Sequence, residues 1–585
     1  MACRGARASL GLALVRRGHG TSEAAEGQSG SALHSPVMIR HFLRTWAPSG
    51  LHPLWFTSAT TLWLVTLANV PLWRQLYQLP EVNGFRGCLF GLGMAAMIAG
   101  LTHALISLLN ARRLLKPVLS LFLLSAASGA YFMLSYGIVI DPTMIQNVAQ
   151  TDPREAADLL NWRMLVILGF LGGLPVWVLW QVPQKPLGAL QRWMGNGISV
   201  LLSIALMVLS LLVIYQDFAS VMRNHTQIRY LINPLNSFFS VGWVAAQPLQ
   251  RESTVLLPLG EDAQMALPTG QAPATIVLVL GETARMGNFG INGYERNTTP
   301  RLAQSDVVSL QGVMSCGTST AASVPCMFSH LGRGGYDKRP ANYETVLDVL
   351  QRAGLAVLWV DNQSGCKGVC DRVPQASTSE LKISPYCDGG ECHDEVMLQG
   401  LQARIAELPA ERRAKGTVIV MHQMGSHGPA YYKRVPGAFK KFQPECASNA
   451  LQDCSREQVV NAYDNTILYT DHFLAETIGW LQRQKTPGAL MYVSDHGESL
   501  GENNLYLHGL PYSVAPDVQK RVAWINWFSS SFEAQRQIST ACLRQKVQEP
   551  LSHDNYFHSV LGLAGVRTSV YQRQLDVFAS CRPAP

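Results

Sequence analysis

The chain has 585 residues, including 49 glycines and 31 prolines, and is long enough for several domains, since one core usually takes ~100 to 200 residues. Hydrophobic residues make up 48% and charged residues 15%, below the ~25% charge of an ordinary soluble protein, which excludes a disordered or wholly cytosolic chain. The net charge of +7 is spread along the chain without clusters of basic and aromatic residues, which argues against nucleic-acid binding.

Five apolar stretches in the first 216 residues approach the ~20-residue length that crosses a bilayer as a helix. They lie near residues 53–73, 87–110, 117–139, 164–182 and 196–216. A buried core helix is the alternative for any one stretch, but five in succession without an amphipathic soluble pattern indicate membrane spans. We therefore predict a five-helix transmembrane domain over residues 51–216.

Lysine and arginine in the short flanks predict the orientation, because positive flanks stay on the cytoplasmic side. Positive charge gathers before the first stretch, between the second and third (112–116), and between the fourth and fifth (Lys185, Arg192). Everything after residue 216 is then expected outside the cytoplasm. Residues 1–50 are expected to form a cytoplasmic tail, in which a short signal-like run and an alternative start at Met38 remain open.

Ten of the twelve cysteines follow residue 315, and this even number favours disulfides in an oxidising compartment. The neighbouring pairs are Cys316/Cys326, Cys366/Cys370, Cys387/Cys392, Cys446/Cys454 and the distant Cys542/Cys581. A zinc ribbon built from the second and third pairs is the alternative, but its spacings are wider than the usual two-residue knuckle. Disulfides agree with the orientation that the flanking charges predict.

Residues 217–272 are expected to connect two domains. The stretch is amphipathic from Phe218 to Ala246 and then rich in proline and glycine. It can lie along the membrane surface or pack as an ordinary solvated helix on the following domain.

Residues 273–585 alternate short β-branched runs with segments of helical period. Four runs are apolar on both faces, as the strands of a parallel sheet covered on both sides must be. They are residues 274–280, 356–360, 417–421 and 489–493. The pattern predicts an α/β domain with a mostly parallel sheet.

Polar groups follow each of these four runs, at the sheet edge where α/β proteins bind ligands. Each group alone is weak evidence, because a glutamate after a strand more often caps a helix, but their coincidence favours a site. Glu282, Asp495 and His496 follow the first and last runs. Two carboxylates and an imidazole suit Zn²⁺ better than Mg²⁺, which prefers oxygen and water.

A segment between Cys316 and Cys326 offers a nucleophile. Its candidate hydroxyls are Thr318, Ser319, Thr320 and Ser323. A hydroxyl at a helix start would meet backbone N–H groups that also attract phosphate, and coordination to zinc would lower its pKa. Spacing alone leaves the choice among the four open, and also fits an ordinary capped loop.

Six motifs together carry a resemblance to a known family. They are residues 279–285 (VLGETAR), 292–296 (NGYER), 316–329, 422–430 (HQMGSHGPA), 461–465 (NAYDN) and 492–502 (YVSDHGESLGE). The sequence resembles the lipid A phosphoethanolamine transferases, which include the mobilised colistin-resistance enzymes. The resemblance covers the chain from about Leu51. It implies an alkaline-phosphatase-like periplasmic domain on five membrane helices of the bacterial inner membrane.

The resemblance also implies the chemistry. Thr320 would be the nucleophile, and it would complete a zinc shell of Glu282, Asp495 and His496. Phosphatidylethanolamine would be the donor and lipid A the acceptor, and the transfer would pass through a phospho-threonine intermediate. The modification of lipid A would confer resistance to polymyxins. One zinc ion is expected, with a possible second, and we expect a monomer.

Further site residues are implied by position in the family motifs. Those expected near a second zinc or the substrate are His427 and His508; those expected at the head group are Ser364, Lys367, Asn147 and Glu155. Thr151, in the same loop as Asn147 and Glu155, can add a hydroxyl there. The sequence departs from the family at Ala322, where the colistin-resistance relatives carry tyrosine, and at Gly365-Cys366. Both departures could change how the head group is held.

Other functions fit parts of this pattern. Related folds transfer phosphoglycerol or hydrolyse sulfate and phosphate esters, and the acceptor could be the lipopolysaccharide inner core instead of lipid A. Outside enzymes, five membrane helices and a disulfide-bonded domain could form a sensor or an assembly factor. The run from Met424 to Pro429 favours the phosphoethanolamine transferase.

Overall fold

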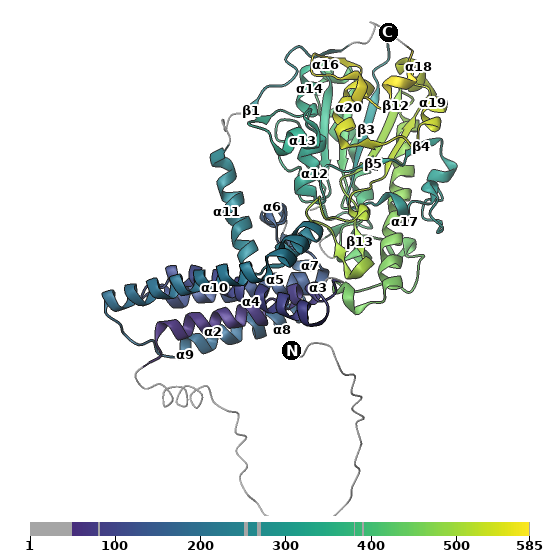
Figure 1. Ribbon diagram of the computed structural model, residues 1–585. Coiled ribbons are helices and arrows are strands. Elements are labelled where there is room, and N and C mark those ends of the chain that lie inside the picture. Colours follow the sequence, from purple (N-terminus) through teal and green to yellow (C-terminus); the bar gives the residue numbers. More distant parts are fainter. Residues whose placement is uncertain are drawn as a thin grey trace, which may run out of the picture. The chain divides into compact units, whose positions relative to one another are not determined.

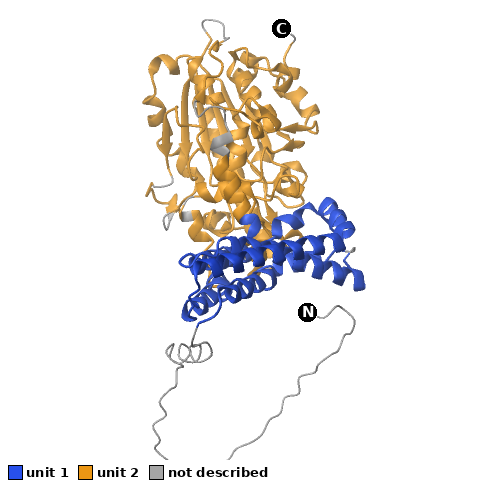
Figure 2. Ribbon diagram, turned by 60° about the vertical axis from the view of Figure 1, so that its left-hand side comes forward, with its two compact units in different colours: residues 1–131, 163–237 blue, residues 132–162, 238–585 orange. Residues whose placement is uncertain are grey.

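The computed structural model describes residues 50–79, 82–151, 153–250, 256–265, 271–378, 381–388 and 391–583. The expected cytoplasmic tail, residues 1–49 and the start at Met38 included, lies outside the described residues. The chain divides into two compact units (Figure 2). Unit 1 consists of residues 1–131 and 163–237, and unit 2 of residues 132–162 and 238–585.

Unit 1 is helical in the part of the chain that the structure describes (Figure 1). Its helices are α2 (Pro53–Thr66), α3 (Val70–Leu76), α4 (Gly84–Leu108), α5 (Leu115–Tyr136), which ends in unit 2, α8 (Trp162–Leu168), α9 (Leu174–Gln181) and α10 (Ala189–Asn224). A π-helical turn at Gly169–Gly173 joins α8 to α9, so these two form one continuous helical segment.

Four helical segments among the described residues are long and apolar enough to cross a membrane: Gly84–Leu108, Leu115–Tyr136, Trp162–Gln181 and Ala189–Asn224. The prediction of five spans was therefore wrong at the first stretch, residues 53–73. Helix α2 ends after 14 residues, and α3 begins with Pro71 in its first turn. Proline lacks the N–H that a continuing helix needs. The Asn69 side chain donates to the Leu64 carbonyl at 2.8 Å and stabilises the break.

Helices α4 and α10 pack closely because glycines of α4 lie against α10. A Cβ on Gly100 would lie 2.6 Å from the carbonyl oxygen of Ser203, and one on Gly93 would lie 2.4 Å from Cγ2 of Ile214. Small residues allow apolar helices to approach in this way. Nδ1 of His103, on α4, lies 2.9 Å from the hydroxyl of Ser203, on α10. This hydrogen bond gives the imidazole a polar partner inside an apolar unit.

A seven-stranded sheet forms the centre of unit 2 (Figure 1), in the order β4-β15-β12-β3-β11-β7-β8. The strands are β3 (Thr275–Gly281), β4 (Val307–Leu310), β7 (Ala356–Asp361), β8 (Gln375–Ser377), β11 (Thr417–His422), β12 (Gly488–Ser494) and β15 (Trp524–Phe528). The four predicted strands are β3, β7, β11 and β12, and they pair in parallel.

The prediction of a mostly parallel sheet was wrong at one side, because the sheet is mixed. Strand β15 runs antiparallel to both β12 and β4. A strand that is buried on both faces appears in the sequence as a continuous apolar run. Such a run does not indicate whether the strand pairs in parallel or antiparallel with its neighbours.

Unit 2 contains further helices and short strands besides this sheet. The helices are α6 (Pro142–Gln150), α7 (Pro153–Asp158), α11 (Leu235–Gln250), α12 (Thr320–Met327), α13 (Gly332–Asp337), α14 (Val346–Arg352), α15 (Leu401–Ala406), α16 (Ala410–Arg413), α17 (Arg456–Arg483), α18 (Ser530–Arg536), α19 (Thr540–Gln545) and α20 (Tyr556–Ala564). The short strands are β1 (Leu256–Leu257), β2 (Gln264–Met265), β5 (Val313–Met314), β6 (Asn342–Tyr343), β9 (Cys387–Asp388), β10 (Glu391–Cys392), β13 (Ser499–Leu500), β14 (Tyr506–Leu507), β16 (Leu551–Ser552) and β17 (Val566–Arg567).

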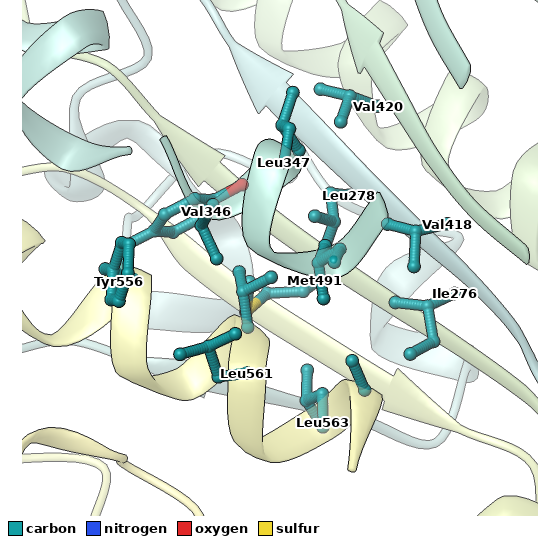
Figure 3. Packing of buried hydrophobic residues seen from close by; sticks show 14 of the residues in the cluster. Ile276, Leu278, Val346, Leu347, Val418, Val420, Met491, Tyr556, Leu561 and Leu563 are labelled. Carbon is teal, nitrogen blue, oxygen red and sulfur yellow. The ribbon is translucent and has the colours of Figure 1, made fainter. Parts of the chain in front are cut away.

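Both faces of the sheet are buried. On one face, α14 and α20 pack on alternate strand residues (Figure 3), and this core includes Ile276, Leu278, Val418, Met491, Leu347 and Leu561. The intervening residues of β3, such as Val277, are also buried and point to the other face, where α17 packs against β12. Because burying one such side chain stabilises the fold by ~1.5 to 3 kcal/mol, this two-sided core fixes the strand ends firmly.

Five disulfides lie in unit 2, between the cysteines that are neighbours in the sequence: Cys316–Cys326, Cys366–Cys370, Cys387–Cys392, Cys446–Cys454 and Cys542–Cys581. The zinc ribbon is excluded, because each of its four cysteines is in a disulfide.

Candidate active site

The carboxyl ends of two neighbouring parallel strands bring three candidate metal ligands together. Ser494, the last residue of β12, lies beside Gly281, the last residue of β3. The chain continues into Asp495 and His496 after β12 and into Glu282 after β3, and these three side chains are fully buried. Their ligand atoms all lie within 4.8 Å of one another. The strand-end argument therefore identified residues that meet in space.

Thr320 is the first residue of α12 and faces the same group. Its hydroxyl donates to Oε2 of Glu282 at 3.1 Å, and its Oγ1 lies 3.4 Å from Nε2 of His496. The structure thus places one of the four candidate hydroxyls directly against the candidate ligands.

Two of the other hydroxyls are bonded to backbone carbonyls. Thr318 donates to the carbonyl of Leu510 at 2.6 Å, and Ser323 donates to that of Asp495 at 2.5 Å. These bonds hold the loop and α12 to neighbouring segments, which is a structural use of the two side chains. Of these three hydroxyls, that of Thr320 contacts the side chains of two candidate metal ligands, whereas Ser323 also lies 3.2 Å from Nδ1 of His553.

The buried carboxylates fit a divalent cation. Burial, together with the neighbouring carboxylate of Asp495, raises the pKa of Glu282 well above its usual range. Oδ2 of Asp495 is buried and accepts no hydrogen bond from the residues that the structure describes. Such an arrangement is unfavourable unless a cation compensates it. One imidazole nitrogen, carboxylate oxygens and the Thr320 hydroxyl form a donor set that suits Zn²⁺.

Two further histidines extend this group. The ring of His508 lies 4.3 Å from that of His496 between centroids, and the ring of His427 lies 5.7 Å from that of His508. Burial lowers the pKa of His508 to about 4. Burial, and then His508, lower the pKa of His427 well below its usual range. In this structure both rings therefore favour the neutral form near pH 7, in which one ring nitrogen can accept a proton or a hydrogen bond.

A carboxylate of α7 reaches His427. Oε2 of Glu155 lies 3.7 Å from Nε2 of His427. Asn147 lies on α6, which packs against α12. The hydroxyl of Thr151, which follows α6, donates to the backbone carbonyl of Asn147 at 2.8 Å. Of the three residues expected in this segment, Glu155 makes the direct contact with a candidate catalytic side chain.

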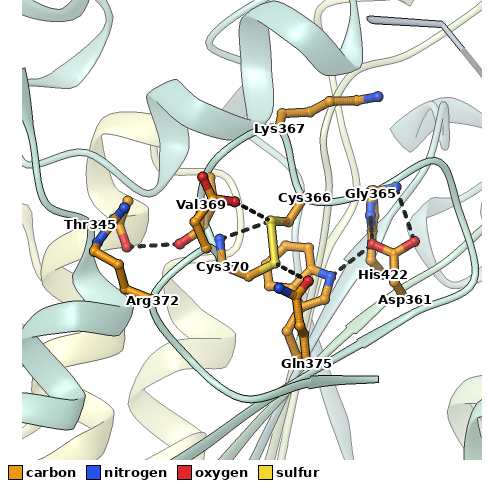
Figure 4. Close-up of a disulfide and its surroundings, with 12 residues drawn as sticks. Thr345, Asp361, Gly365, Cys366, Lys367, Val369, Cys370, Arg372, Gln375 and His422 are labelled. Atoms are coloured by element: carbon orange, nitrogen blue, oxygen red, sulfur yellow. Dashed lines mark hydrogen bonds and ion pairs between the residues drawn. A yellow bond between two sulfur atoms is a disulfide. The ribbon is translucent and has the colours of Figure 1, made fainter. Parts of the chain in front are cut away.

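Ser364 and Lys367 lie on the loop after β7, which the Cys366–Cys370 disulfide closes (Figure 4). Figure 4 shows the Lys367 side chain extending away from the disulfide. The Lys367 ammonium donates to Oγ of Ser364 at 2.9 Å and to the carbonyl of Gln150, the last residue of α6, at 3.1 Å. This loop therefore contacts the segment that holds Asn147 and Glu155.

Gly365 and Cys366 shape the backbone of this loop. Gly365 has φ +88°, in the left-handed region that glycine adopts without strain. Cys366 forms the disulfide immediately before Lys367. The two residues together let the chain turn and fix the backbone from which Lys367 extends.

Some residues in contact with the site were not assigned from the sequence. Gln363 donates from Nε2 to Oε2 of Glu282 at 3.2 Å, and Oε2 of Glu498 lies 3.4 Å from Nδ1 of His508. Burial raises the pKa of Glu498 to about 8. Both residues stand just after predicted strands, so position in the sequence was an available signal for them.

Comparisons with known proteins identify the family to which the chain belongs. Residues 274–566 match the family described as Sulfatase, and residues 98–249 match the family described as Phosphoethanolamine transferase EptA/EptB. The Salmonella typhimurium (strain LT2) phosphoethanolamine transferase EptA is 40% identical over 530 residues, which cover 89% of this chain and 96% of that protein. The Escherichia coli phosphatidylethanolamine transferase Mcr-1 is 38% identical over 511 residues, covering 84% and 92%.

A solved structure matches almost the whole chain. It is the integral membrane protein lipooligosaccharide phosphoethanolamine transferase A (EptA) from Neisseria meningitidis, with a TM-score of 0.87 and 34% sequence identity. The match covers 90% of this chain and 99% of that one. Both the helical segments and the sheet domain are therefore shared, as the motifs predicted. The chain belongs to the phosphoethanolamine transferase family.

Proposed function

We propose that this protein transfers phosphoethanolamine from phosphatidylethanolamine to lipid A, with Thr320 as the nucleophile and Zn²⁺ as the metal. The observation that carries the proposal is the position of the Thr320 hydroxyl at the start of α12, 3.1 Å from Glu282 and 3.4 Å from His496. The relatives include a phosphatidylethanolamine transferase and a lipooligosaccharide phosphoethanolamine transferase, which supports the donor and the class of acceptor.

In the first step, Oγ1 of Thr320 forms a bond to the donor phosphorus while the bond from phosphorus to the diacylglycerol oxygen breaks. The Thr320 hydroxyl hydrogen is directed at Glu282, so the proton leaves toward this carboxylate. The departing diacylglycerol oxygen takes up one proton, which the neutral rings of His508 and His427 can relay. The product is phosphoethanolamine esterified to Thr320.

In the second step, an oxygen of the acceptor forms a bond to the same phosphorus while the bond from phosphorus to the Thr320 oxygen breaks. The proton that the attacking acceptor hydroxyl loses passes to the Thr320 oxygen, which restores the threonine hydroxyl. Bound by Glu282, Asp495 and His496, zinc supplies a Lewis acid that offsets negative charge at the reacting oxygens. The Lys367 ammonium is suited to the phosphate, and the Glu155 carboxylate to the ammonium of ethanolamine. Because both substrates are lipids, a catalytic unit joined to membrane helices fits the reaction.

The test is head-group release from a fluorescent phosphatidylethanolamine by the full-length protein. Thr320→Ala is expected to abolish release, because it removes the hydroxyl that contacts Glu282 and His496 and acts as the nucleophile in the proposed reaction. Ser319→Ala, which removes the adjacent hydroxyl, is the matched control and is expected to stay near wild type. If Thr320→Ala kept more than about a tenth of the activity, the activation free energy would have risen by less than ~1.4 kcal/mol. That result would rule out covalent catalysis through this residue.

A second measurement tests the intermediate directly. Mass spectrometry of the protein isolated from membranes is expected to find phosphoethanolamine on Thr320. The same measurement separates an enzyme from a sensor or assembly factor, which would carry no such modification.

A further inference from the structure

Thr283, the residue that follows the candidate ligand Glu282, has a strained backbone. Its φ is +52°, and it is one of seven non-glycine residues with positive φ among those that the structure describes. Branching at Cβ makes this conformation unfavourable for threonine. The side chain is fully buried, and its hydroxyl has no hydrogen-bond partner among the described residues. The Thr283 side chain therefore does not stabilise the turn, and other residues must hold it.

One buried hydroxyl bridges this turn. Tyr463, on the long helix α17, donates from its OH to the carbonyl of Thr283 at 2.7 Å. The same oxygen accepts the N–H of Arg285 at 2.9 Å. Tyr463 is fully buried, so no water is available to replace these two bonds. A single side chain therefore fixes the backbone on both sides of Ala284.

The turn also joins the two candidate carboxylate ligands. The N–H of Thr283 donates to Oδ1 of Asp495 at 3.1 Å, and the N–H of Ala284 donates to Oγ of Ser494 at 2.8 Å. The backbone of Thr283 thus holds Asp495 while the preceding side chain, Glu282, faces Thr320. A change in the turn would alter the separation of the two carboxylates.

We infer that Tyr463 is a positioning residue for the metal site. Its hydroxyl holds the left-handed turn at Thr283, and the turn sets Glu282 and Asp495 at the separation that a cation requires. The inference rests on the proposed zinc site. Tyr463 acts through the backbone and is not a ligand, so its removal weakens the affinity for zinc without removing a donor atom.

The experiment is a measurement of Zn²⁺ affinity on the full-length protein in detergent, by competition with a chromophoric chelator after metal removal. Tyr463→Phe is expected to weaken zinc binding about tenfold, in the range typical of groups that orient ligands. The matched control is Tyr469→Phe on the same helix, whose hydroxyl accepts a 3.4 Å bond from the N–H of Glu395. Zinc affinity of the control is expected to equal that of wild type.

A second variant separates positioning from general destabilisation. Glycine adopts φ +52° without strain, so Thr283→Gly combined with Tyr463→Phe is expected to recover most of the lost affinity. Wild-type affinity in Tyr463→Phe, or a double variant as weak as Tyr463→Phe, would overturn the inference. A wild-type protein that does not bind zinc would instead overturn the proposed function, so the two failures are distinguishable.

Discussion

The carboxylate of Glu155 and the ring of His427 approach within 3.7 Å, although the two residues are far apart in the sequence. In the proposed reaction, this carboxylate pairs with the ammonium of the ethanolamine head group. A charged hydrogen bond of this kind contributes about 1.5 to 3 kcal/mol, or roughly ten- to hundredfold in affinity. Under this proposal, the Glu155 carboxylate contributes to recognition of the donor separately from the candidate metal ligands.

We predict that Glu155→Gln weakens use of a membrane-embedded phosphatidylethanolamine by about ten- to hundredfold. The variant should keep its zinc content and its hydrolysis of a small soluble phosphodiester, because Glu155 is not a candidate ligand. The measurement is head-group release from lipid vesicles beside turnover of the soluble ester. Glu411→Gln, an exposed carboxylate of the same unit, is the control. Equal turnover of the lipid by wild type and Glu155→Gln would show that the carboxylate does not hold the donor.

At this scale, position in the sequence identified some residues of the site and missed others. Glu282, Asp495 and His496 were found because parallel strands place the residues after them at one edge. Thr320 could not be chosen by spacing, because four hydroxyls share one segment; the family resemblance selected it. Tyr463 lies in the motif at residues 461–465, but the motif gave it no role, since its contact with Thr283 depends on how α17 packs on the sheet.

Helix α7 is six residues long and depends on other elements for its position. Asp158 at its end pairs with Nη2 of Arg434 at 2.9 Å and with Nζ of Lys433 at 2.5 Å. The buried Arg434 also pairs with Glu391 of β10 and donates from Nε to the carbonyl of His427 at 3.0 Å. One guanidinium therefore joins α7, β10 and the segment that carries His427, which fixes Glu155 opposite His427.

We predict that Asp158→Asn raises KM for the lipid donor about tenfold and lowers kcat less, because α7 loses its charged attachment while the catalytic residues remain. Loss of one partner of a buried ion pair costs about 3 to 5 kcal/mol, so the midpoint of thermal unfolding should also fall. Steady-state kinetics with vesicle substrates and thermal unfolding provide the two measurements.

The matched control is Asp306→Asn, which removes a carboxylate from an exposed ion pair with Arg544. Surface pairs contribute only about 0 to 1 kcal/mol, so neither KM nor stability should change measurably. If Asp158→Asn behaves like this control, the ion pair does not position α7.

The sequence predicts helices and strands well where the period of apolar residues identifies the element. It predicts them poorly where a single polar residue or proline ends a helix, or where the direction of a strand has to be known. The strands β3, β7, β11 and β12 are long apolar runs and were found. The first apolar stretch was read as one helix, although Asn69 and Pro71 divide it into α2 and α3. The reversed strand β15 pairs through contacts with β12 and β4 that no local pattern encodes.

The residues that the structure describes combine four apolar helical segments with a unit that contains five disulfides. Disulfides persist in an oxidising compartment, and Arg112 and Arg113 lie between α4 and α5, where positive charge favours the cytoplasm. These observations support the proposal that the catalytic unit faces the periplasm and the α4–α5 turn faces the cytoplasm.

We predict that single cysteines introduced at exposed positions report opposite sides of the inner membrane. Gly437→Cys, in the catalytic unit, should react with a membrane-impermeant maleimide once the outer membrane is opened, and Ala111→Cys, between α4 and α5, only after the inner membrane is also disrupted. Wild type supplies the background, and its ten cysteines after residue 315 should stay unlabelled unless first reduced. The orientation would be wrong if the two introduced cysteines reacted in the reverse order. Labelling of all ten native cysteines without reductant would likewise contradict an oxidising compartment, because a disulfide sulfur does not react with a maleimide.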